Sequence, residues 1–393
     1  MRRKQILVCG ILAVMIALAF TACNNDTEPA HVHDSGEWHI TLAATCTETG
    51  TKELRCTVDN FVLDTDTIAI DPDAHDWGNW ITTATATQAG EEKNVCRHNA
   101  THIKDTRSVL VPMVFVQGGA FQLGKQLGSL AGQTNYEDVT PVSNVTISDF
   151  FIGKYEVTQA QWQAVMGRTI TEQQALATTS TTNRGRSDDR PIYYANWYEA
   201  IVFCNKLSVR EGLTPAYRIS NSANPDDWGT VPASNTATNK AVWDAVEVVS
   251  SSTGYRLPTE AQWEYAAKGG NTGEAFTYAG SDNPDEVAWH NNNSGDNGGN
   301  TNRNIHVVGT KSPNGLGLYD MIGNISERCW DWAEDYTSEN KTDPTGPPSG
   351  SDDTRVIRGG DWNNSVERSA NRSEYYPHYR GMGIGFRLAR PAE

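Results

Sequence analysis

Residues 254–270 read GYRLPTEAQWEYAAKGG, and this stretch contains a complete start signal for one helix. Thr259 stands directly before the helix, and Gln262 follows at the third helical position. Threonine and glutamine in these two places form a capping box, in which each side chain bonds the backbone amide of the other residue. The stretch therefore predicts a helix that begins after Thr259, with Trp263 near its start as a core anchor.

Two other stretches begin with the same device. Thr158 with Gln161 opens EVTQAQWQAVMG, and Asn196 with Glu199 opens NWYEAIVFCNKLSVREG. The second of these ends at Gly212, and glycine is a common residue just beyond a helix. We therefore expect two more helices, of which the second is the longer.

The helix after Asn196 has an apolar face. Four residues fall on it: Ala200, Ile201, Cys204 and Leu207. Cys204 is therefore predicted to be a core residue rather than a nucleophile. Trp162 and Trp197 come early in their helices and are predicted to be core anchors, like Trp263. Long Asn-, Ser- and Gly-rich stretches such as residues 290–304 separate the helices, so we expect an α+β domain with sparse regular secondary structure and large surface loops.

The first 23 residues have the order of an export signal. Three basic residues precede an apolar run at 6–20, and the small residues Thr21 and Ala22 precede Cys23. The run is short for a transmembrane anchor. Cys23, followed by polar residues, is similar to a bacterial lipobox, although Phe20 stands where leucine is usual. We expect a signal peptide over 1–22, a linker over 23–30, and lipid on Cys23 that anchors the chain to a bacterial membrane at the outer-membrane surface.

The charge and the cysteines exclude two classes of protein. The formal net charge is −16, and removal of the three basic residues in 1–22 takes it to −19. Phosphate would be repelled, so we expect no nucleic-acid partner. With Cys9 removed and Cys23 lipidated, five cysteines remain, and an odd number does not indicate a disulfide framework.

Residues 31–110 contain an internal repeat, because His33–Cys56 matches His75–Cys96 in its glycines, tryptophans and final cysteine. Threonine-rich alternation with regular glycines predicts short strands and turns. Zinc is an alternative, but neither copy has a complete CxxC pair, and Cys46 corresponds to Ala86 in the second copy. We expect a small β-rich spacer in which Cys46 and Cys56 can pair under oxidising conditions.

Four motifs stand in a fixed order: GYRLPTEAQWEYAAKGG, NGLGLYDMIGNISERCWDW, VIRGGDWNN and GFRLAR. With them the chain resembles the formylglycine-generating enzyme (sulfatase-modifying factor) family over the domain at residues 111–393. The resemblance implies an elaborated C-type lectin fold. Within the family, it leaves open whether this chain is an enzyme or a binding protein.

The copper site of the enzyme branch of this family has no counterpart in this chain. That branch uses two cysteines shortly after the RGG motif, and here the matching positions hold Asn364 and Ser369. Neither an amide nor a hydroxyl replaces a thiolate as a ligand for Cu(I), so no copper is expected. No HxxxHxE, GxSxG or HExxH motif is present. The acidic segment at Asp331, Glu334 and Asp335 could hold paired carboxylates for glycoside chemistry, and a solvated acidic loop is the favoured interpretation.

A calcium site is also implied by the resemblance. By position, its ligands would be the Asp320 and Glu327 side chains and the Gly323 and Ile325 carbonyls. Four oxygen donors with two carboxylates suit a hard cation in a structural role. The alternative is that Asp320 and Glu327 cap backbone groups in a tight turn.

The terminal segment, about residues 355–390, resembles the variable region of proteins diversified by retroelements. With a lipid anchor, the whole chain resembles spirochete variable surface lipoproteins of the Treponema variable protein type. Adenine changes in Asn codons give Ser, Asp, Tyr, His or Gly, and such residues fill 361–383. Rigid tyrosines among adaptable Asn, Ser and Gly are also typical of antibody paratopes. The predicted ligand contacts are Asp361, Trp362, Asn363, Asn364, Ser365, Glu367, Ser373, Glu374, Tyr375, Tyr376, His378, Tyr379, Gly381, Met382 and Gly383.

The sequence thus predicts a surface lipoprotein without enzymatic activity, whose terminal segment binds a protein on a host or neighbouring cell. A carbohydrate ligand is less favoured, because sugar-binding lectins of this fold often use an exposed calcium. Two other classes remain open: an enzyme of this superfamily with unrecognised chemistry, and a structural envelope protein.

Overall fold

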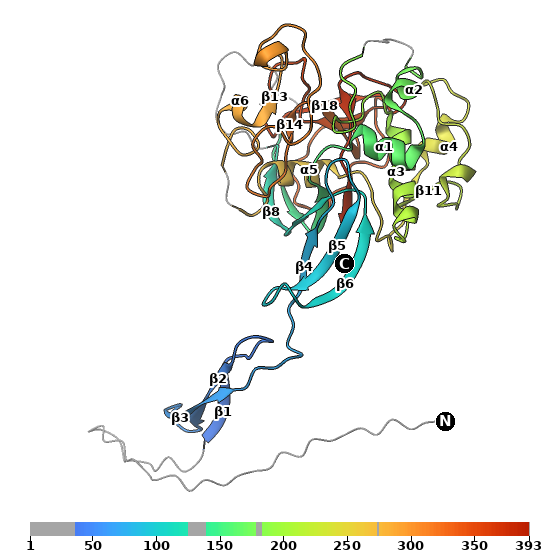
Figure 1. The fold of residues 1–393 in the computed structure, drawn as a ribbon. Coiled ribbons are helices and arrows are strands. Elements are labelled where there is room, and N and C mark those ends of the chain that lie inside the picture. Colours follow the sequence, from blue (N-terminus) through green and yellow to red (C-terminus); the bar gives the residue numbers. More distant parts are fainter. Residues whose placement is uncertain (1–35, 125–138, 178–182, 273–274, 393) are drawn as a thin grey trace, which may run out of the picture. The chain divides into compact units, whose positions relative to one another are not determined.

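A computed structural model describes residues 36–124, 139–177, 183–272 and 275–392 (Figure 1). The predicted signal peptide and Cys23 lie outside the described residues. No helix in the described part of the chain is long and apolar enough to cross a bilayer. The chain up to Asn79, together with Asn94–Lys104, forms one compact unit, and Trp80–Lys93 with the chain from Asp105 onward forms a second, larger one.

The two copies of the repeat form two three-stranded sheets, which confirms the prediction of short strands. The first consists of β1 (Gly36–Leu42), β2 (Gly50–Cys56) and β3 (Val62–Ile68). The second consists of β4 (Trp77–Thr82), β5 (Gly90–Cys96) and β6 (Ile103–Val109). The matched glycines Gly50 and Gly90 are required by close backbone approach, because an added Cβ would lie 2.4 Å from the Leu42 carbonyl oxygen and 2.3 Å from the Ala84 nitrogen.

Two expectations for the N-terminal region need correction. The predicted domain boundary at residue 110 does not match the contacts, because the middle of the second copy belongs to the larger unit. The buried Glu92 carboxylate lies 3.1 Å from the Arg390 guanidinium, and a buried carboxylate requires such a partner. No disulfide joins Cys46 to the predicted partner Cys56, and the Cys46 sulfur lies 3.5 Å from that of Cys96.

The larger unit is built from small sheets. One of them brings both ends of the domain together, because β20 (Ala389–Pro391) and β7 (Met113–Val116) flank β10 (Phe150–Gly153). Another has the order β16 (Lys341–Thr342), β9 (Ser143–Ile147) and β8 (Gly119–Leu123). Two pairs are shorter: β11 (Tyr217–Arg218) with β12 (Glu247–Val248), and β13 (Ala288–Trp289) with β14 (Ile322–Gly323).

The terminal segment belongs to a four-stranded sheet. Its order is β18 (Arg372–Tyr375), β17 (Arg355–Arg358), β15 (Ser326–Trp332) and β19 (Ile384–Gly385). β18 is therefore an edge strand, with one side free of a strand partner within this sheet.

All three predicted helix starts are confirmed. α1 (Gln159–Met166), α3 (Trp197–Arg210) and α5 (Glu260–Ala267) each begin with a capping box in which both reciprocal hydrogen bonds are present. A fourth capping box opens α2 (Ile170–Gln174). The remaining short helices are α4 (Lys240–Asp244), α6 (Pro284–Val287), η2 (Pro225–Asp227) and η3 (Asp296–Gly298).

The core of the larger unit contains the predicted anchors. Trp162, Trp197 and Trp263 are fully buried. Trp162 stacks on Phe203 with ring centroids 5.7 Å apart, and Phe386 of the final motif contacts both rings edge-on. Cys204 is also buried, and burial raises the pKa of its thiol far above the usual range, so it is a core residue as predicted.

Candidate functional site

The frame of the terminal segment is made by arginines that point inward. Arg358, Arg387 and Arg390 are fully buried. The Arg358 guanidinium pairs with Glu264 of α5, and that of Arg387 forms two bonds of 2.5 and 2.6 Å to the Glu327 carboxylate. Arginine is rarely buried unless it is paired. These ion pairs fix the backbone of the segment to distant parts of the domain.

Two further ion pairs and a hydrogen bond hold the tip of the segment, which we define as residues 372–380. Arg372 bonds Glu260 of α5 at 2.8 Å, and Arg380 pairs with Glu199 of α3. The Trp197 amide donates to the Pro377 carbonyl at 2.9 Å, so the start of α3 also contacts the tip. The backbone that carries the exposed side chains is therefore held from both sides.

The outward-facing residues are the polar and aromatic ones. Tyr375 and Tyr376 are 39% and 43% exposed. We define the C-terminal patch as the exposed residues of the predicted set together with the half-buried rings beside them: Asn363, Asn364, Ser365, Ser373, Glu374, Tyr375, Tyr376, His378 and Tyr379.

The rings of the C-terminal patch form two stacked pairs. Tyr375 stacks on Tyr379 with centroids 4.8 Å apart and planes 14° from parallel. Tyr376 stacks on His378 at 5.6 Å and 24°. The Tyr379 carbonyl also accepts a bond of 2.5 Å from the buried Arg328. Because each ring is held by its neighbour, little rotamer freedom is left to lose on binding.

Burial and nearby charges shift the pKa values of two of these rings, Tyr375 and His378. The pKa of Tyr375 is raised, mainly by burial and to a smaller extent by the nearby Tyr379 and Asp361. The pKa of His378 is lowered, mainly by burial and to a smaller extent by the cations Arg328, Lys240 and Arg380. Both shifts favour the uncharged forms of Tyr375 and His378.

Asp361, which is half-buried, shapes the turn that begins the C-terminal patch, and its contact with a ligand stays a prediction. One carboxylate oxygen accepts bonds from the Asn363 and Asn364 amides at 2.8 and 3.1 Å. A Cβ at Gly383 would lie 2.5 Å from the other oxygen, so Gly383 allows this carboxylate to approach. Burial raises the pKa of Asp361, against the lowering effect of the two amides.

Three further predicted contacts are scaffold positions. Trp362 is 1% exposed and packs in the core, and its carbonyl accepts a 2.6 Å bond from the Ser294 hydroxyl. The Gly381 and Gly383 carbonyls accept from the Tyr194 and Ser326 amides at 3.0 and 2.8 Å. The prediction was wrong for these residues because the terminal segment crosses the core at both ends of the exposed stretch.

Two other predicted contacts, Met382 and Glu367, lie at the margin of the C-terminal patch. Met382 is half-buried and packs against the hydrophobic core. The Glu367 side chain lies over Gly360, where an added Cβ would be 3.0 Å from the carboxyl carbon. We leave both residues out of the C-terminal patch.

A neighbouring loop borders the C-terminal patch and was missed by the sequence analysis. The Asn291 amide donates to the Asn364 carbonyl at 3.0 Å, and the Arg303 guanidinium lies 3.3 Å from the Asn363 carbonyl oxygen. Both residues belong to the stretch at 290–304. Its Asn- and Gly-rich composition predicted a surface loop but gave no sign of its position.

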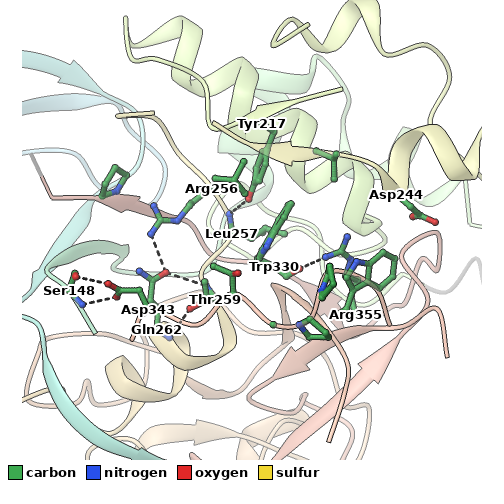
Figure 2. Close-up of a pocket in the computed structure, with 18 of the residues that line it drawn as sticks. Ser148, Tyr217, Asp244, Arg256, Leu257, Thr259, Gln262, Trp330, Asp343 and Arg355 are labelled. Carbon is green, nitrogen blue, oxygen red and sulfur yellow. Dashed lines mark hydrogen bonds between the residues drawn. The ribbon is translucent and has the colours of Figure 1, made fainter. Parts of the chain in front are cut away.

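A separate cavity of about 690 Å³ lies elsewhere in the larger unit (Figure 2). Tyr217 and Trp330 stack there with centroids 5.1 Å apart, and the Arg355 guanidinium lies 3.5 Å from the centre of the Trp332 ring. Arg256 bonds Gln262 at 3.3 Å on another part of the wall. No residue of the C-terminal patch lines this cavity, so the domain has two distinct candidate sites.

The Arg387 guanidinium, from the final motif, lies against the turn with the predicted calcium ligands. Both Glu327 oxygens are bonded to Arg387, and one also accepts from the Trp263 indole at 2.7 Å. Asp320 is buried, with one oxygen accepting from Gly309 and the other without a partner. The residues do not fit a calcium ion in this arrangement, because Glu327 would have to exchange a guanidinium for the metal. Calcium here, with the Gly323 and Ile325 carbonyls as further ligands, stays a prediction.

The acidic segment differs from the expected solvated loop at one residue. Glu334 and Asp335 are exposed, but Asp331 is buried at the end of β15 and accepts a 2.7 Å bond from the first amide of α5. Burial and the adjacent Glu260 raise its pKa to about 7. Asp331 is therefore a capping group and not one of a pair of exposed catalytic carboxylates.

Comparison with known proteins agrees with this geometry. Residues 99–392 match the family model described as the sulfatase-modifying factor enzyme 1-like domain. A chaperone protein, LppX, of Paenibacillus barcinonensis is 37% identical over 284 residues, which are 70% of this chain and 85% of the relative. The formylglycine-generating enzyme of Mus musculus is 26% identical over 71% of this chain and 75% of the enzyme.

Two solved structures resemble the fold. Treponema denticola variable protein 1 superposes with a TM-score of 0.57 at 34% identity, covering 73% of this chain and 96% of that protein. CarF superposes with a TM-score of 0.50 at 28% identity, covering 72% of this chain and 99% of that one.

Proposed function

Because the chain belongs to the family of sulfatase-modifying factor enzyme 1-like domains, with the C-type lectin fold in its variable-protein form, we propose that it is a ligand-binding protein without enzymatic activity. The ligand contacts would come from the C-terminal patch. The observation that carries this proposal is the pair of ring stacks, Tyr375 on Tyr379 and Tyr376 on His378, exposed on a frame of buried arginine–glutamate pairs.

A protein ligand suits this surface best. Tyrosines supply large, rigid contact area at interfaces, and the exposed Asn and Ser side chains around them supply adaptable hydrogen bonds. A sugar-binding calcium would need exposed ligands, whereas Asp320 and Glu327 are 2% and 0% exposed. Nucleic acid is disfavoured by the net charge of −16.

The place of action follows from the N-terminal sequence. We propose that lipid on Cys23 attaches the chain to the bacterial membrane and that the larger unit is displayed at the outer-membrane surface, facing a host or neighbouring cell. The resemblance to a variable protein supports display, and the lipobox-like sequence supports the anchor. In this proposal the terminal segment is diversified by a retroelement, so that related chains bind different ligands.

Binding to cells tests the proposal. Labelled chain would be applied to cultured epithelial cells and to bacteria from the same habitat, and its binding compared with that of Tyr375→Ala/Tyr376→Ala. We expect at least about a ten-fold weaker binding for this variant, as for other aromatic anchors that become buried when a partner binds. Phe276→Ala is the matched control, because Phe276 is a 41% exposed aromatic outside the C-terminal patch. Equal binding by all three chains would contradict the proposal.

A second candidate is an enzyme with other chemistry in the cavity of Figure 2. The observation in its favour is the cavity itself, together with 26% identity to a formylglycine-generating enzyme. The positions that match the copper cysteines, Asn364 and Ser369, carry no thiol. Mass spectrometry of cysteine peptides and of oligosaccharides incubated with the chain tests this candidate, and turnover that Trp330→Ala abolishes would establish it.

A further inference from the structure

Three metal-binding side chains converge in the N-terminal unit, outside the domain that carries the C-terminal patch, and Cys96 lies beside them. The ligand atoms of Cys46, His75 and His102 all lie within 4.8 Å of one another. The Cys96 sulfur lies 3.5 Å from that of Cys46, and Cys96 also forms a hydrogen bond with the His75 ring. We propose that Cys46, His75, Cys96 and His102 hold a structural zinc ion.

The donor set selects zinc. Two thiolates and two imidazoles in a tetrahedron form a structural zinc site, with Zn–S about 2.3 Å and Zn–N about 2.0–2.1 Å. Two sulfurs bound to one tetrahedral zinc lie about 3.8 Å apart, whereas bonded sulfurs of a disulfide lie about 2.05 Å apart. The 3.5 Å between Cys46 and Cys96 is close to the first distance.

The imidazoles are oriented for a ligand. The Nδ1 atoms of His75 and His102 are both buried and have no hydrogen-bond partner. The two rings meet edge to face with centroids 4.9 Å apart. The Nε2 atom of His102 lies 3.4 Å from the side-chain nitrogen of Asn99, so the nitrogen opposite Nδ1 already has a neighbour. A buried ring nitrogen without a partner is costly unless it binds an ion or water.

The backbone around the four residues is fixed. The Cys96 amide donates to the His102 carbonyl at 3.0 Å and closes the loop that carries both. The Arg97 amide donates to the Asp76 carbonyl at 2.8 Å, which places His75 beside this loop, and the Asp71 amide donates to the Thr45 carbonyl at 3.1 Å, next to Cys46. Three segments far apart in sequence therefore present their ligands in a set position.

The unit needs such a site because it has very little core. In β1, Trp38, Ile40 and Leu42 are 44%, 69% and 58% exposed. Among the described residues of 36–79, the buried apolar side chains are those of Cys46 and Cys56. A three-stranded sheet without a packed face is marginal in water, and small domains of this kind commonly depend on a disulfide or a metal. Zinc binding would supply the missing folding free energy.

The site also explains why the two copies differ at one cysteine. Cys46 lies in the loop between β1 and β2 of the first copy, but its three partners belong to the second copy: His75 lies before β4, Cys96 ends β5, and His102 lies between β5 and β6. The first copy thus completes the ligand set of the second. Ala86, which corresponds to Cys46, has no following copy to complete, and so needs no thiol.

Metal content of the full chain tests the site. Chain extracted from the membrane of an expression host in detergent, without chelator, should contain about one zinc per molecule by elemental mass spectrometry. Cys46→Ala and His102→Ala should each lower the zinc content at least about ten-fold. Cys56→Ala is the control, because Cys56 is a buried cysteine of the same unit outside the ligand set, and its zinc content should stay at that of the parent chain.

Cobalt gives a second readout that does not depend on the stability of the variants. After chelation, Co²⁺ added to the parent chain should produce the absorption of a tetrahedral ion and a sulfur-to-metal charge-transfer band. Either of two results would overturn the proposal: a parent chain with neither zinc nor the tetrahedral cobalt spectrum, or peptide mapping that finds Cys46 and Cys96 joined as a disulfide in freshly isolated chain.

Discussion

Replacing Asp320 with asparagine should stabilise the chain at neutral and higher pH. Asp320 is 2% exposed, lies near Glu156 and Glu327, and has one carboxylate oxygen without a partner. Its φ of 53° is in the left-handed region, which asparagine also tolerates. The Gly309 amide can bond an amide oxygen as it bonds the carboxylate. The substitution therefore removes a charge and keeps the shape of the turn.

The magnitude follows from the pKa of Asp320. Burial raises it from the ordinary 3.8 to about 6, against the lowering effect of the Gly309 amide. Because the folded-state pKa is the higher one, the folded chain holds the proton more tightly, and stability falls as pH rises between these values. The difference between the two pKa values then costs about 3 kcal/mol of folding free energy at about pH 8, where the folded carboxylate is ionised, and about 1 kcal/mol at about pH 4.5, where it takes up a proton on folding. The Asp320→Asn variant avoids this cost, so its advantage over the parent chain should grow with pH.

Calorimetric unfolding at these two pH values measures the effect. We expect Asp320→Asn to raise Tm by roughly 5–10 °C at about pH 8 and by much less at about pH 4.5. Asp335→Asn, at an exposed aspartate, is the control and should change Tm little at either pH. A lower Tm for Asp320→Asn at about pH 8, together with a calcium-dependent Tm of the parent chain, would refute the reasoning and establish Asp320 as a cation ligand.

Three other substitutions test the frame and the exposed surface by urea unfolding. Arg387→Met should lower the free energy of unfolding by about 3–5 kcal/mol, because Glu327 stays buried without its counter-charge; a loss below about 1 kcal/mol would contradict this. Trp362→Ala should cost about 3–5 kcal/mol as a cavity in the core, and unchanged stability would place this ring at the surface instead. Tyr376→Ala should change stability by less than about 0.5 kcal/mol, as exposed positions do, and a larger loss would make Tyr376 a structural residue.

Local signals made the helices and their anchors predictable. A capping box needs only two residues three positions apart, so α1, α3 and α5 could be placed from Thr158, Asn196 and Thr259, each with its Gln or Glu three positions later. The family motifs likewise gave the C-type lectin fold, because they are short and stand in a fixed order. The exposed part of the terminal segment could be recognised by composition.

Pairing between distant segments could not be predicted. The arginines of the terminal segment point inward only because Glu199, Glu260, Glu264 and Glu327 meet them from other elements. Trp362 belongs to the same polar stretch as Asn363 but is turned into the core. The four proposed zinc ligands come from three segments, so no short spacing motif contains them.

Sequencing the last hundred or so coding nucleotides across many isolates tests the central claim most directly. We expect substitutions at the exposed positions of the C-terminal patch, at adenines of a nearby template copy. We also expect no change at Trp362, Gly381, Gly383 and the buried arginines. Substitutions spread evenly through 355–390, or an invariant segment in every isolate, would contradict a diversified binding surface.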